Sequence, residues 1–184
     1  MRIIGGSAKG VRLAAVPPGT RPVSDRAREG LFSSLGERAT GAVVLDLFAG
    51  TGALGIEALS RGGIEATFVD HARSATKAVR ENLVRANLAD RGTAFTADVP
   101  SHLRKPPANA ADVVFADPPY DMESEKIDAL LQAIATGHVA EGFTVVLTRG
   151  KGSSAPALPL HWAVARQLHY GDSLVFLYRE VGWA

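Results

Sequence analysis

The tetrapeptide Asp117-Pro118-Pro119-Tyr120 combines residue types that suit chemistry on an aromatic amino group. It follows residues 112–116, which are expected to form a buried strand. Because proline donates no backbone hydrogen bond, this loop presents acceptors, among them the Asp117 carboxylate and the Pro118 carbonyl. Such acceptors suit the amino group of a nucleobase, on whose ring Tyr120 would stack. The pattern predicts catalysis by positioning and electrostatics at that nitrogen, and the structural alternative is a turn that only ends the strand.

A glycine-rich turn at residues 50–52 forms a second candidate site. It joins an apolar run at 43–47 to a predicted helix over 53–60, so backbone N–H groups at the helix start can face a ligand. The spacing of Gly50, Gly52 and Gly55 also fits the dinucleotide fingerprint, which keeps a nicotinamide-dependent dehydrogenase open. Asp46 argues against a pyrophosphate there and favours a ligand with sulfonium and ammonium groups. A tight turn without a ligand is the third reading.

Acidic residues end four of the predicted parallel strands. Parallel strands bring their carboxyl ends to one edge of a sheet, which is where open α/β sheets bind ligands. Each acid could instead cap the helix that follows it, but the recurrence of the pattern favours a binding edge. These residues are Asp46, Asp70, Asp98 and Asp117.

The elements that must position these residues alternate as in an α/β fold. Apolar runs and helical patterns predict a doubly wound parallel sheet that closes with an antiparallel hairpin at the C-terminus. The predicted strands cover 43–47, 66–69, 93–97, 112–116, 143–147, 162–168 and 173–179. The predicted helices after the glycine turn cover 53–60, 72–88, 101–104 and 124–135.

Composition places the chain among ordinary globular proteins. Its 184 residues are 46% hydrophobic and 21% charged, and none is cysteine, which excludes disulfides and cysteine metal sites. No apolar run reaches the length of about 18 residues that a transmembrane helix needs. No secretory signal is recognisable, and the five histidines are scattered. We therefore expect a cytoplasmic protein, a monomer, with no membrane partner and no metal.

The first 40 residues are unusually basic. They carry seven Lys or Arg against three acids, whereas the whole chain has a net charge of only +1. Residues 2–13 read as a β-hairpin, and Ser24 as the N-cap of a helix that ends at Gly36. We expect residues 1–40 to form a small extension over the glycine turn that meets nucleic-acid phosphates, and residues 41–184 to form the catalytic domain. A merely solvated basic surface is the alternative.

These motifs together resemble a known family. Asp46-x-Phe48-x-Gly50-x-Gly52 with the Asp-Pro-Pro-Tyr tetrapeptide is similar to class I S-adenosylmethionine-dependent methyltransferases that act on amino groups. The segments 2–6, 24–32 and 48–62 resemble the RsmD family, whose members methylate N2 of one guanine in 16S ribosomal RNA. The resemblance implies a Rossmann-like fold, S-adenosylmethionine as cofactor, and the small ribosomal subunit or an assembly intermediate as partner.

The resemblance also implies roles for individual residues. The catalytic loop would be Asp117, Pro118, Pro119 and Tyr120. The cofactor would be held by Asp46, Phe48, Gly50, Thr51, Gly52, Asp70, His71, Asp98 and Val99. Asp46 would lie near its ammonium group, Asp70 near the ribose, and Asp98 and Val99 near the adenine. RNA would be bound by Lys9, Arg12, Arg21, Ser24, Arg26 and Arg28. One departure is Thr148-Arg149, where such enzymes often carry an acid at the end of the fifth strand.

Other substrates share this chemistry. Adenine N6 and cytosine N4, in RNA or DNA, also present amino groups, so only the N-terminal resemblance favours guanine. A glutamine-amide methyltransferase would usually place Asn at the position of Asp117. A protein that binds RNA without catalysis could keep the same fold.

Overall fold

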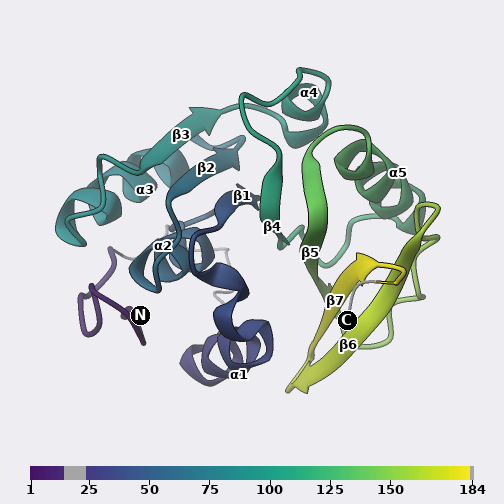
Figure 1. Ribbon diagram of the computed structural model, residues 1–184, viewed down its shortest axis with the longest axis horizontal. Coiled ribbons are helices and arrows are strands. Elements are labelled where there is room, and N and C mark those ends of the chain that lie inside the picture. The colour runs from purple at the N-terminus through teal and green to yellow at the C-terminus, as the bar shows by residue number, and fades with distance from the viewer. Residues whose placement is uncertain (15–23, 183–184) are drawn as a thin grey trace.

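A computed structural model describes residues 1–14 and 24–182, which include a single mixed sheet with helices on both faces (Figure 1). The sheet has seven strands in the order β3-β2-β1-β4-β5-β7-β6. The first five strands are parallel, and β7 and β6 complete the sheet in antiparallel orientation. The predicted α/β class, doubly wound topology and C-terminal hairpin are confirmed.

The elements follow the predicted order closely. The strands are β1 (Val43–Leu47), β2 (Glu65–Asp70), β3 (Gly92–Thr96), β4 (Ala111–Ala116), β5 (Val139–Gly150), β6 (Trp162–Tyr170) and β7 (Ser173–Glu180). The helices are α1 (Asp25–Leu35), the 3-10 helix η1 (Gly36–Ala39), α2 (Ala53–Ser60), α3 (Arg73–Arg85), α4 (Val99–Leu103) and α5 (Ser124–Ala135).

Two hydrophobic layers enclose the sheet. On one face, α1, α2 and α3 pack on strand residues such as Phe68, Phe115 and Leu177. On the other face, α4 and α5 pack on residues such as Leu47, Val114 and Leu147. Alternate residues of a strand point to opposite faces, so the nearly continuous apolar sequence of the central strands is explained by burial on both sides.

The order of the strands reverses between β1 and β4. Leu47 at the end of β1 lies in register with Ala116 at the end of β4. The glycine turn and the Asp117 loop therefore emerge side by side, at the switch point where open α/β sheets bind ligands. This topology brings together two motifs that are about 70 residues apart in the sequence.

The N-terminal segment forms the predicted hairpin in a minimal form. Its two arms meet at one antiparallel bridge, between Arg2 and Arg12, and the backbone N–H of Ile3 donates to the carbonyl oxygen of Val11 at 2.9 Å. The segment lies mainly along α2, where Glu57 and Ser60 bind its backbone, and it reaches the glycine turn where the Thr51 hydroxyl contacts the Met1 sulfur at 3.9 Å. Its apolar residues, such as Ile3 and Leu13, belong to the same core as α1 and α2.

The strand β5 is longer than expected. The apolar run predicts 143–147, whereas the strand extends over Val139–Gly150, because Val139 pairs with Ala111 of β4 at its start and β7 pairs with it as far as Gly150 at its end. No helix within residues 1–14 and 24–182 is long and apolar enough to cross a bilayer.

Candidate active site at the switch point of the sheet

The glycine turn after β1 is built around the buried carboxylate of Asp46. One of its oxygens accepts a hydrogen bond of 2.9 Å from the backbone N–H of Gly55, which ties the end of the strand to the first turn of α2. Gly50 and Gly52 have positive φ values of 56° and 75°, a conformation that glycine adopts without strain. A side chain placed on Gly50 would meet nothing within 4 Å, so open space borders the turn.

Gly55 is required by its close contacts. A Cβ atom there would lie 2.4 Å from the Phe68 ring and 3.0 Å from the Asp46 carboxylate. We therefore expect Gly55→Ala to cost about 1–3 kcal/mol of folding free energy through overpacking, and to weaken binding at the turn because Asp46 is displaced. Urea denaturation and calorimetry with S-adenosylmethionine measure the two effects. Gly137→Ala is the comparison for backbone strain without overpacking, because its φ of 83° is unfavourable for alanine while a Cβ there has no neighbour within 4 Å. An unchanged midpoint in Gly55→Ala would contradict the packing argument.

Asp70 lies at the end of β2 and shapes the same turn. Its two carboxylate oxygens accept hydrogen bonds from the backbone N–H groups of Gly50 and Ala72, both at 2.9 Å. The neighbouring His71 side chain is 80% exposed. Asp70 is thus a rigid acceptor beside the glycine turn, which is compatible with its predicted contact to a ribose.

Asp98 and Val99 mark the end of β3. The Asp98 carboxylate caps α4 by accepting from the backbone N–H and the hydroxyl of Ser101, while Val99 is buried beneath it. Asp98 therefore caps the helix that follows it, which is the structural alternative to ligand binding for an acid at a strand end. This role leaves Asp98 exposed at the rim of the sheet edge, where a ligand can reach it.

The Asp117 loop lies directly beside the end of β1. The backbone N–H of Asp117 points to the carbonyl oxygen of Leu47 at 3.4 Å, and Pro118 is buried while Pro119 and Tyr120 are exposed. Next to it, Phe48 has a φ of 59°, an uncommon value for a residue other than glycine. Strained backbone of this kind often occurs at functional sites.

Burial and mutual repulsion raise the pKa values of the acids here. Burial raises the pKa of Asp117 to about 6, against a smaller opposing effect from the hydrogen bond that Thr148 donates to it. Burial raises the pKa of Asp46 as well, and the charges of Asp117 and Asp70 raise it further, although the Gly55 bond opposes this. Asp46, Asp70 and Asp117 therefore form one electrostatic site that a cationic ligand would stabilise.

Sequence reasoning missed the residues that support the loop from β5 and β7. Tyr120 bonds to the hydroxyl of Ser173 at 2.5 Å, and its ring lies against Gly150. Thr148, which the family resemblance marks only as a departure from an acidic residue, donates a hydrogen bond to the Asp117 carboxylate. The signal for Thr148 was its place at the end of the fifth strand, whereas no pattern in the sequence pointed to Ser173.

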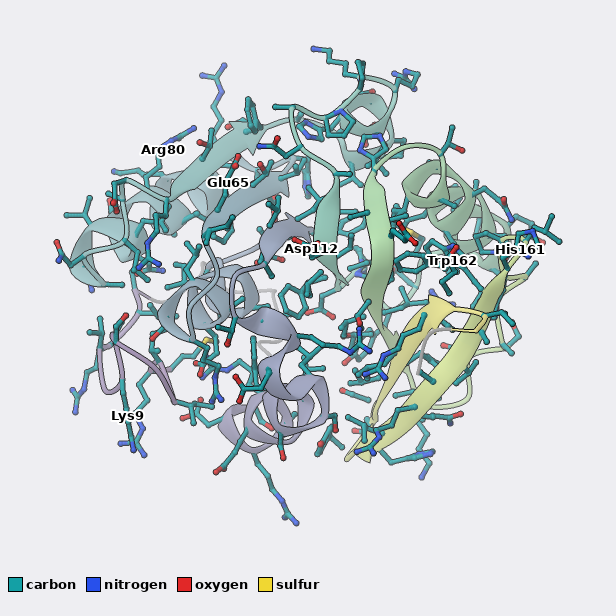
Figure 2. All side chains as sticks on the ribbon, in the orientation of Figure 1. Lys9, Glu65, Arg80, Asp112, His161 and Trp162 are labelled. Atoms are coloured by element: carbon teal, nitrogen blue, oxygen red, sulfur yellow. The ribbon has the colours of Figure 1, made fainter. Side chains whose placement is uncertain are left out.

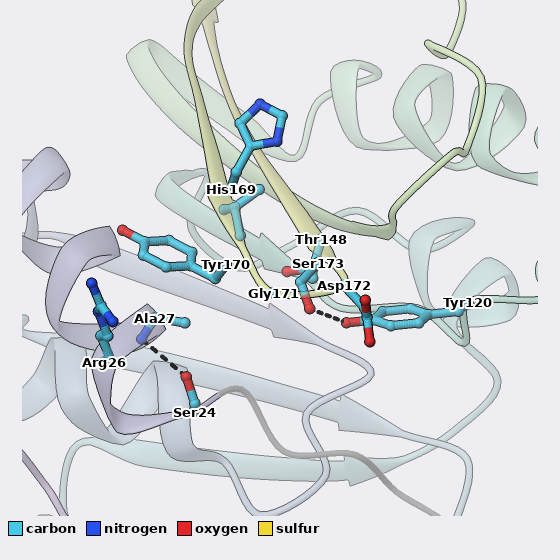
Figure 3. A pocket seen from close by; sticks show the side chains of 11 residues that line it. Ser24, Arg26, Ala27, Tyr120, Thr148, His169, Tyr170, Gly171, Asp172 and Ser173 are labelled. Carbon is cyan, nitrogen blue, oxygen red and sulfur yellow. Dashed lines mark hydrogen bonds between the residues drawn. The ribbon is translucent and has the colours of Figure 1, made fainter.

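A pocket of about 540 Å³ opens next to this loop (Figure 3). Tyr120 and Thr148 line it on the sheet side, and Ser24 and Arg26 line it from the start of α1. The turn between β6 and β7 closes it with Tyr170 and its neighbours. Figure 3 shows Arg26 and Tyr170 on one side of the pocket and Tyr120 on the other. An aromatic ring could enter between these groups.

The basic residues of the N-terminal segment divide into two kinds. Lys9, Arg12 and Arg26 are exposed, and Lys9 projects outward at the edge of the molecule (Figure 2). Ser24 caps α1 by accepting from the N–H of Ala27, as predicted from its position. Arg21 lies outside the described residues.

The prediction that Arg28 contacts RNA is wrong. Its side chain is completely buried, and its guanidinium group binds the carbonyl oxygen of Arg2 at 2.7 Å and the carboxylate of Asp25 at 2.6 Å. The buried carboxylate of Glu57 lies 3.8 Å away. Helical periodicity places Arg28 on the same side of α1 as Leu31 and Leu35, so the residue holds the N-terminal segment on the domain.

No group of His, Asp and Glu within residues 1–14 and 24–182 has the arrangement of a metal site. His138, which is buried, points its ring nitrogen to the carbonyl oxygen of Leu103 at 2.8 Å and thereby joins α4 to the start of β5. It therefore has a structural role.

Comparison with known proteins places this site in context. The family model described as conserved hypothetical protein 95 matches residues 1–179. A putative rRNA methyltransferase of Bacillus subtilis, YlbH, is 35% identical over 99% of this chain and 100% of its own length. The ribosomal RNA small subunit methyltransferase D of Escherichia coli K12 is 33% identical over 98% of this chain and 90% of its own.

Solved structures agree with these relatives. A putative methyltransferase of Escherichia coli, yhhF, superposes with a TM-score of 0.86 at 29% identity, covering 98% of this chain and 97% of that one. A hypothetical protein of Thermus thermophilus superposes with a TM-score of 0.78 at 31% identity, covering 96% and 98%. Fold, site and structural neighbours define the protein as a class I methyltransferase. More narrowly, the chain belongs to the RsmD family.

Proposed function

We propose that the protein transfers a methyl group from S-adenosylmethionine to the N2 amino group of a guanine in the 16S RNA of the small ribosomal subunit. The observation that carries this proposal is the Asp117-Pro118-Pro119-Tyr120 loop, held beside the glycine turn at the switch point of the sheet. Membership of the RsmD family, with relatives named as ribosomal RNA small subunit methyltransferases, supports the substrate.

The residues around the glycine turn fit S-adenosylmethionine. This cofactor supplies an electrophilic methyl group on a positively charged sulfonium, and it also carries an ammonium group. The raised pKa of Asp46 indicates a site short of positive charge, which such a ligand would provide. Asp70 would accept from ribose hydroxyls, Asp98 from the adenine amino group, and Val99 would pack on the ring. The turn from Phe48 to Gly52, together with His71, would border the remaining parts of the cofactor.

Asp117 and its neighbours would act on the base. The Asp117 carboxylate and the Pro118 carbonyl accept hydrogen bonds from the guanine amino group, which aims the nitrogen lone pair and limits its delocalisation into the ring. The nitrogen would form a bond to the methyl carbon as the carbon–sulfur bond of the sulfonium breaks and the neutral thioether leaves, and it would lose one proton, for which the Asp117 carboxylate is an acceptor. Pro119 keeps the loop rigid, and Tyr120, fixed by Ser173, stacks on a base that has left its own stack.

The pH dependence of methyl transfer should report on Asp117. With a pKa of about 6, the group is ionised at neutral pH and becomes protonated, and so a worse acceptor, as the pH falls. We expect the rate to rise with pH through this region and then to level off. In Thr148→Val the pKa of Asp117 should increase, because the variant loses the hydrogen bond that favours the carboxylate. The acidic limb of the pH–rate profile should therefore move to higher pH.

Single-turnover rates between pH 5 and 9 test this expectation. Thr136→Val is the matched control, because its hydroxyl bonds to the Gln132 carbonyl oxygen at the exposed end of α5. If the acidic limb of the pH–rate profile lies at the same pH in Thr148→Val as in the parent protein, the role assigned to Thr148 is contradicted.

The nicotinamide reading has less support, because it gives no role to the Asp117 loop and requires a pyrophosphate next to the buried Asp46. Methylation of adenine N6 or cytosine N4 would use the same loop in the same way. Guanine is proposed on the strength of the family, and the loop alone does not select it.

Organisation and partners follow from the same proposal. Residues 1–40 would serve as an RNA-binding extension, through Lys9, Arg12, Arg21, Ser24 and Arg26, of a catalytic domain formed by residues 41–184. The partner would be the small subunit or an assembly intermediate in the cytoplasm, bound by one copy of the protein.

A methyl-transfer assay tests the proposed substrate. Purified protein, labelled S-adenosylmethionine and small subunits from cells lacking the modification are combined, with deproteinised 16S RNA in a parallel reaction. Ribonuclease-sensitive label in either reaction supports the proposal, and the ratio of the two identifies the form of the RNA that is used. Tight cofactor binding without label in either RNA would contradict it.

A further inference from the structure

A cluster of arginines lies at the opposite end of α1 from the pocket that Arg26 lines. Arg38 belongs to η1, Arg166 to β6 and Arg179 to β7, so the cluster joins the N-terminal segment to the C-terminal hairpin. Arg166 reaches back to α1, where its guanidinium group contacts the hydroxyl of Ser34 at 3.4 Å. Arg38 binds the carbonyl oxygen of Gly142, whose near neighbour Thr144 pairs with Arg179.

The side-chain pattern of the hairpin explains why these groups converge. Leu168 and Tyr170 of β6 pack on the core shared with α1, as does Leu177 of β7. Because alternate residues of a strand share a face, Arg166 and Arg179 point to that same side of the sheet. The edge strand β6 is irregular between Val164 and Arg166, which adjusts the direction of Arg166.

The positive charges of the arginine cluster repel one another. Burial lowers the pKa of Arg179, and the charges of Arg38 and Arg166 lower it further. The Nε atom of Arg179 is buried and has no hydrogen-bond partner within the described part of the chain. The partial negative charge at the C-terminal end of α1 would stabilise one cation nearby, but it does not explain why several are placed there. Guanidinium groups can donate paired hydrogen bonds to the oxygens of a phosphate.

The position of the cluster relates it to the candidate active site. The helix α1 has 11 residues, which corresponds to about 16 Å. Its first turn lines the pocket beside Tyr120, and its last turn contacts Arg166. Tyr170 packs against Gly30 in the middle of the helix, which makes the seam between α1 and β6 continuous. Figure 1 shows α1 beside the hairpin that β6 and β7 form.

We propose that this seam holds the RNA backbone next to the target base, with Arg166 and Arg179 as a phosphate-binding site and Arg38 beside them. The C-terminal hairpin would then share RNA binding with the basic N-terminal segment. This inference rests on the proposed function, because it takes the base pocket beside Tyr120 as the start of the RNA path.

The double variant Arg166→Gln/Arg179→Gln tests the inference. Each phosphate contact on single-stranded RNA contributes about 0.7 to the slope of log affinity against log salt, so the slope should become shallower by about 1.4. At 0.15 M salt, the affinity for deproteinised 16S RNA should fall by about tenfold. The affinity for S-adenosylmethionine should be unchanged, and the thermal midpoint should not fall, because the variant removes two charges that repel each other.

The control Arg80→Gln/Arg85→Gln removes the same charge from α3. Arg80 lies on the far side of the molecule from β6 and β7 (Figure 2), so this variant should keep the full salt slope. Equal losses in the two double variants would indicate a general charge effect and overturn the inference. So would weaker binding to assembled subunits with unchanged affinity for naked RNA, because the arginines would then contact protein.

The outcome is separable from that of the proposed function. If the parent protein fails to methylate RNA, the function itself fails. If the parent methylates RNA and the Arg166→Gln/Arg179→Gln variant binds it with unchanged affinity and salt slope, only the phosphate-binding site is refuted.

Discussion

Replacing Asp117 with alanine should lower the rate of methyl transfer by about 10²- to 10³-fold, as expected when a preorganised hydrogen-bonding group is removed from an active site. Asp117 supplies the one carboxylate of the tetrapeptide, and pairing of β4 with β1 holds it beside the end of β1. Affinity for S-adenosylmethionine should stay within a fewfold of the parent, because Asp46 and Asp70 remain in place. Single-turnover kinetics and calorimetry measure the two quantities.

A stability measurement separates a catalytic role for Asp117 from a structural one. Its pKa is raised from an unfolded value near 3.8 to about 6, so the folded protein loses stability as the pH rises through this interval. The variant lacks that penalty and should unfold at pH 8 at a urea concentration no lower than the parent. Asp121→Ala is the control, since that carboxylate is exposed in the same loop. A destabilised Asp117→Ala protein that lost cofactor binding would contradict the account.

Replacing Glu57 should give the largest loss of stability. Its buried carboxylate accepts hydrogen bonds of 2.8 Å from the N–H groups of Ile4 and Gly5, and of 2.8 Å from the Nε of Arg61. It also lies 3.8 Å from Nη1 of the fully buried Arg28, whose Nη1 and Nε atoms have no hydrogen-bond partner in the described chain. Truncation to alanine leaves the buried Arg28 charge with the exposed carboxylate of Asp25 but without its buried one, and breaking a buried pair typically costs about 3–5 kcal/mol.

Urea denaturation of Glu57→Ala measures this cost. Glu81→Ala is the matched control, because Glu81 is exposed and its contact with Lys77 spans 3.9 Å, so its loss should cost less than about 1 kcal/mol. Similar midpoints for the two variants would refute the view that Glu57 and Arg28 fasten the N-terminal segment. Hydrogen exchange at residues 3–8 should speed up in Glu57→Ala alone.

The sequence was informative wherever the relevant interactions are local. The strand, glycine turn and helix from Val43 to Ser60 have the predicted bounds, because apolar runs and glycine act within a few residues. The cap at Ser24 is local in the same way. Strand-end acids could be grouped at one edge because parallel topology dictates where strands end.

The residues whose roles the sequence does not predict correctly depend on contacts between segments that are distant in the chain. Charge alone predicts that Arg28 is an exposed RNA contact, whereas the side chain is buried against the carbonyl oxygen of Arg2 and the carboxylate of Glu57. Ser173 and Tyr120 are more than 50 residues apart, and only the antiparallel pairing of β7 with β5 brings them together. The extra length of β5 has the same origin, since its final residues are ordered by β7.

The identity of the methylated nucleoside tests the central claim most directly. Small subunits that lack the modification are incubated with labelled S-adenosylmethionine and either the parent protein or Asp117→Ala, and their RNA is digested to nucleosides for chromatography and mass spectrometry. The account predicts label in N2-methylguanosine with the parent and its loss with the variant. Label in N6-methyladenosine or N4-methylcytidine would contradict the assigned base, and undiminished transfer by Asp117→Ala would contradict the mechanism.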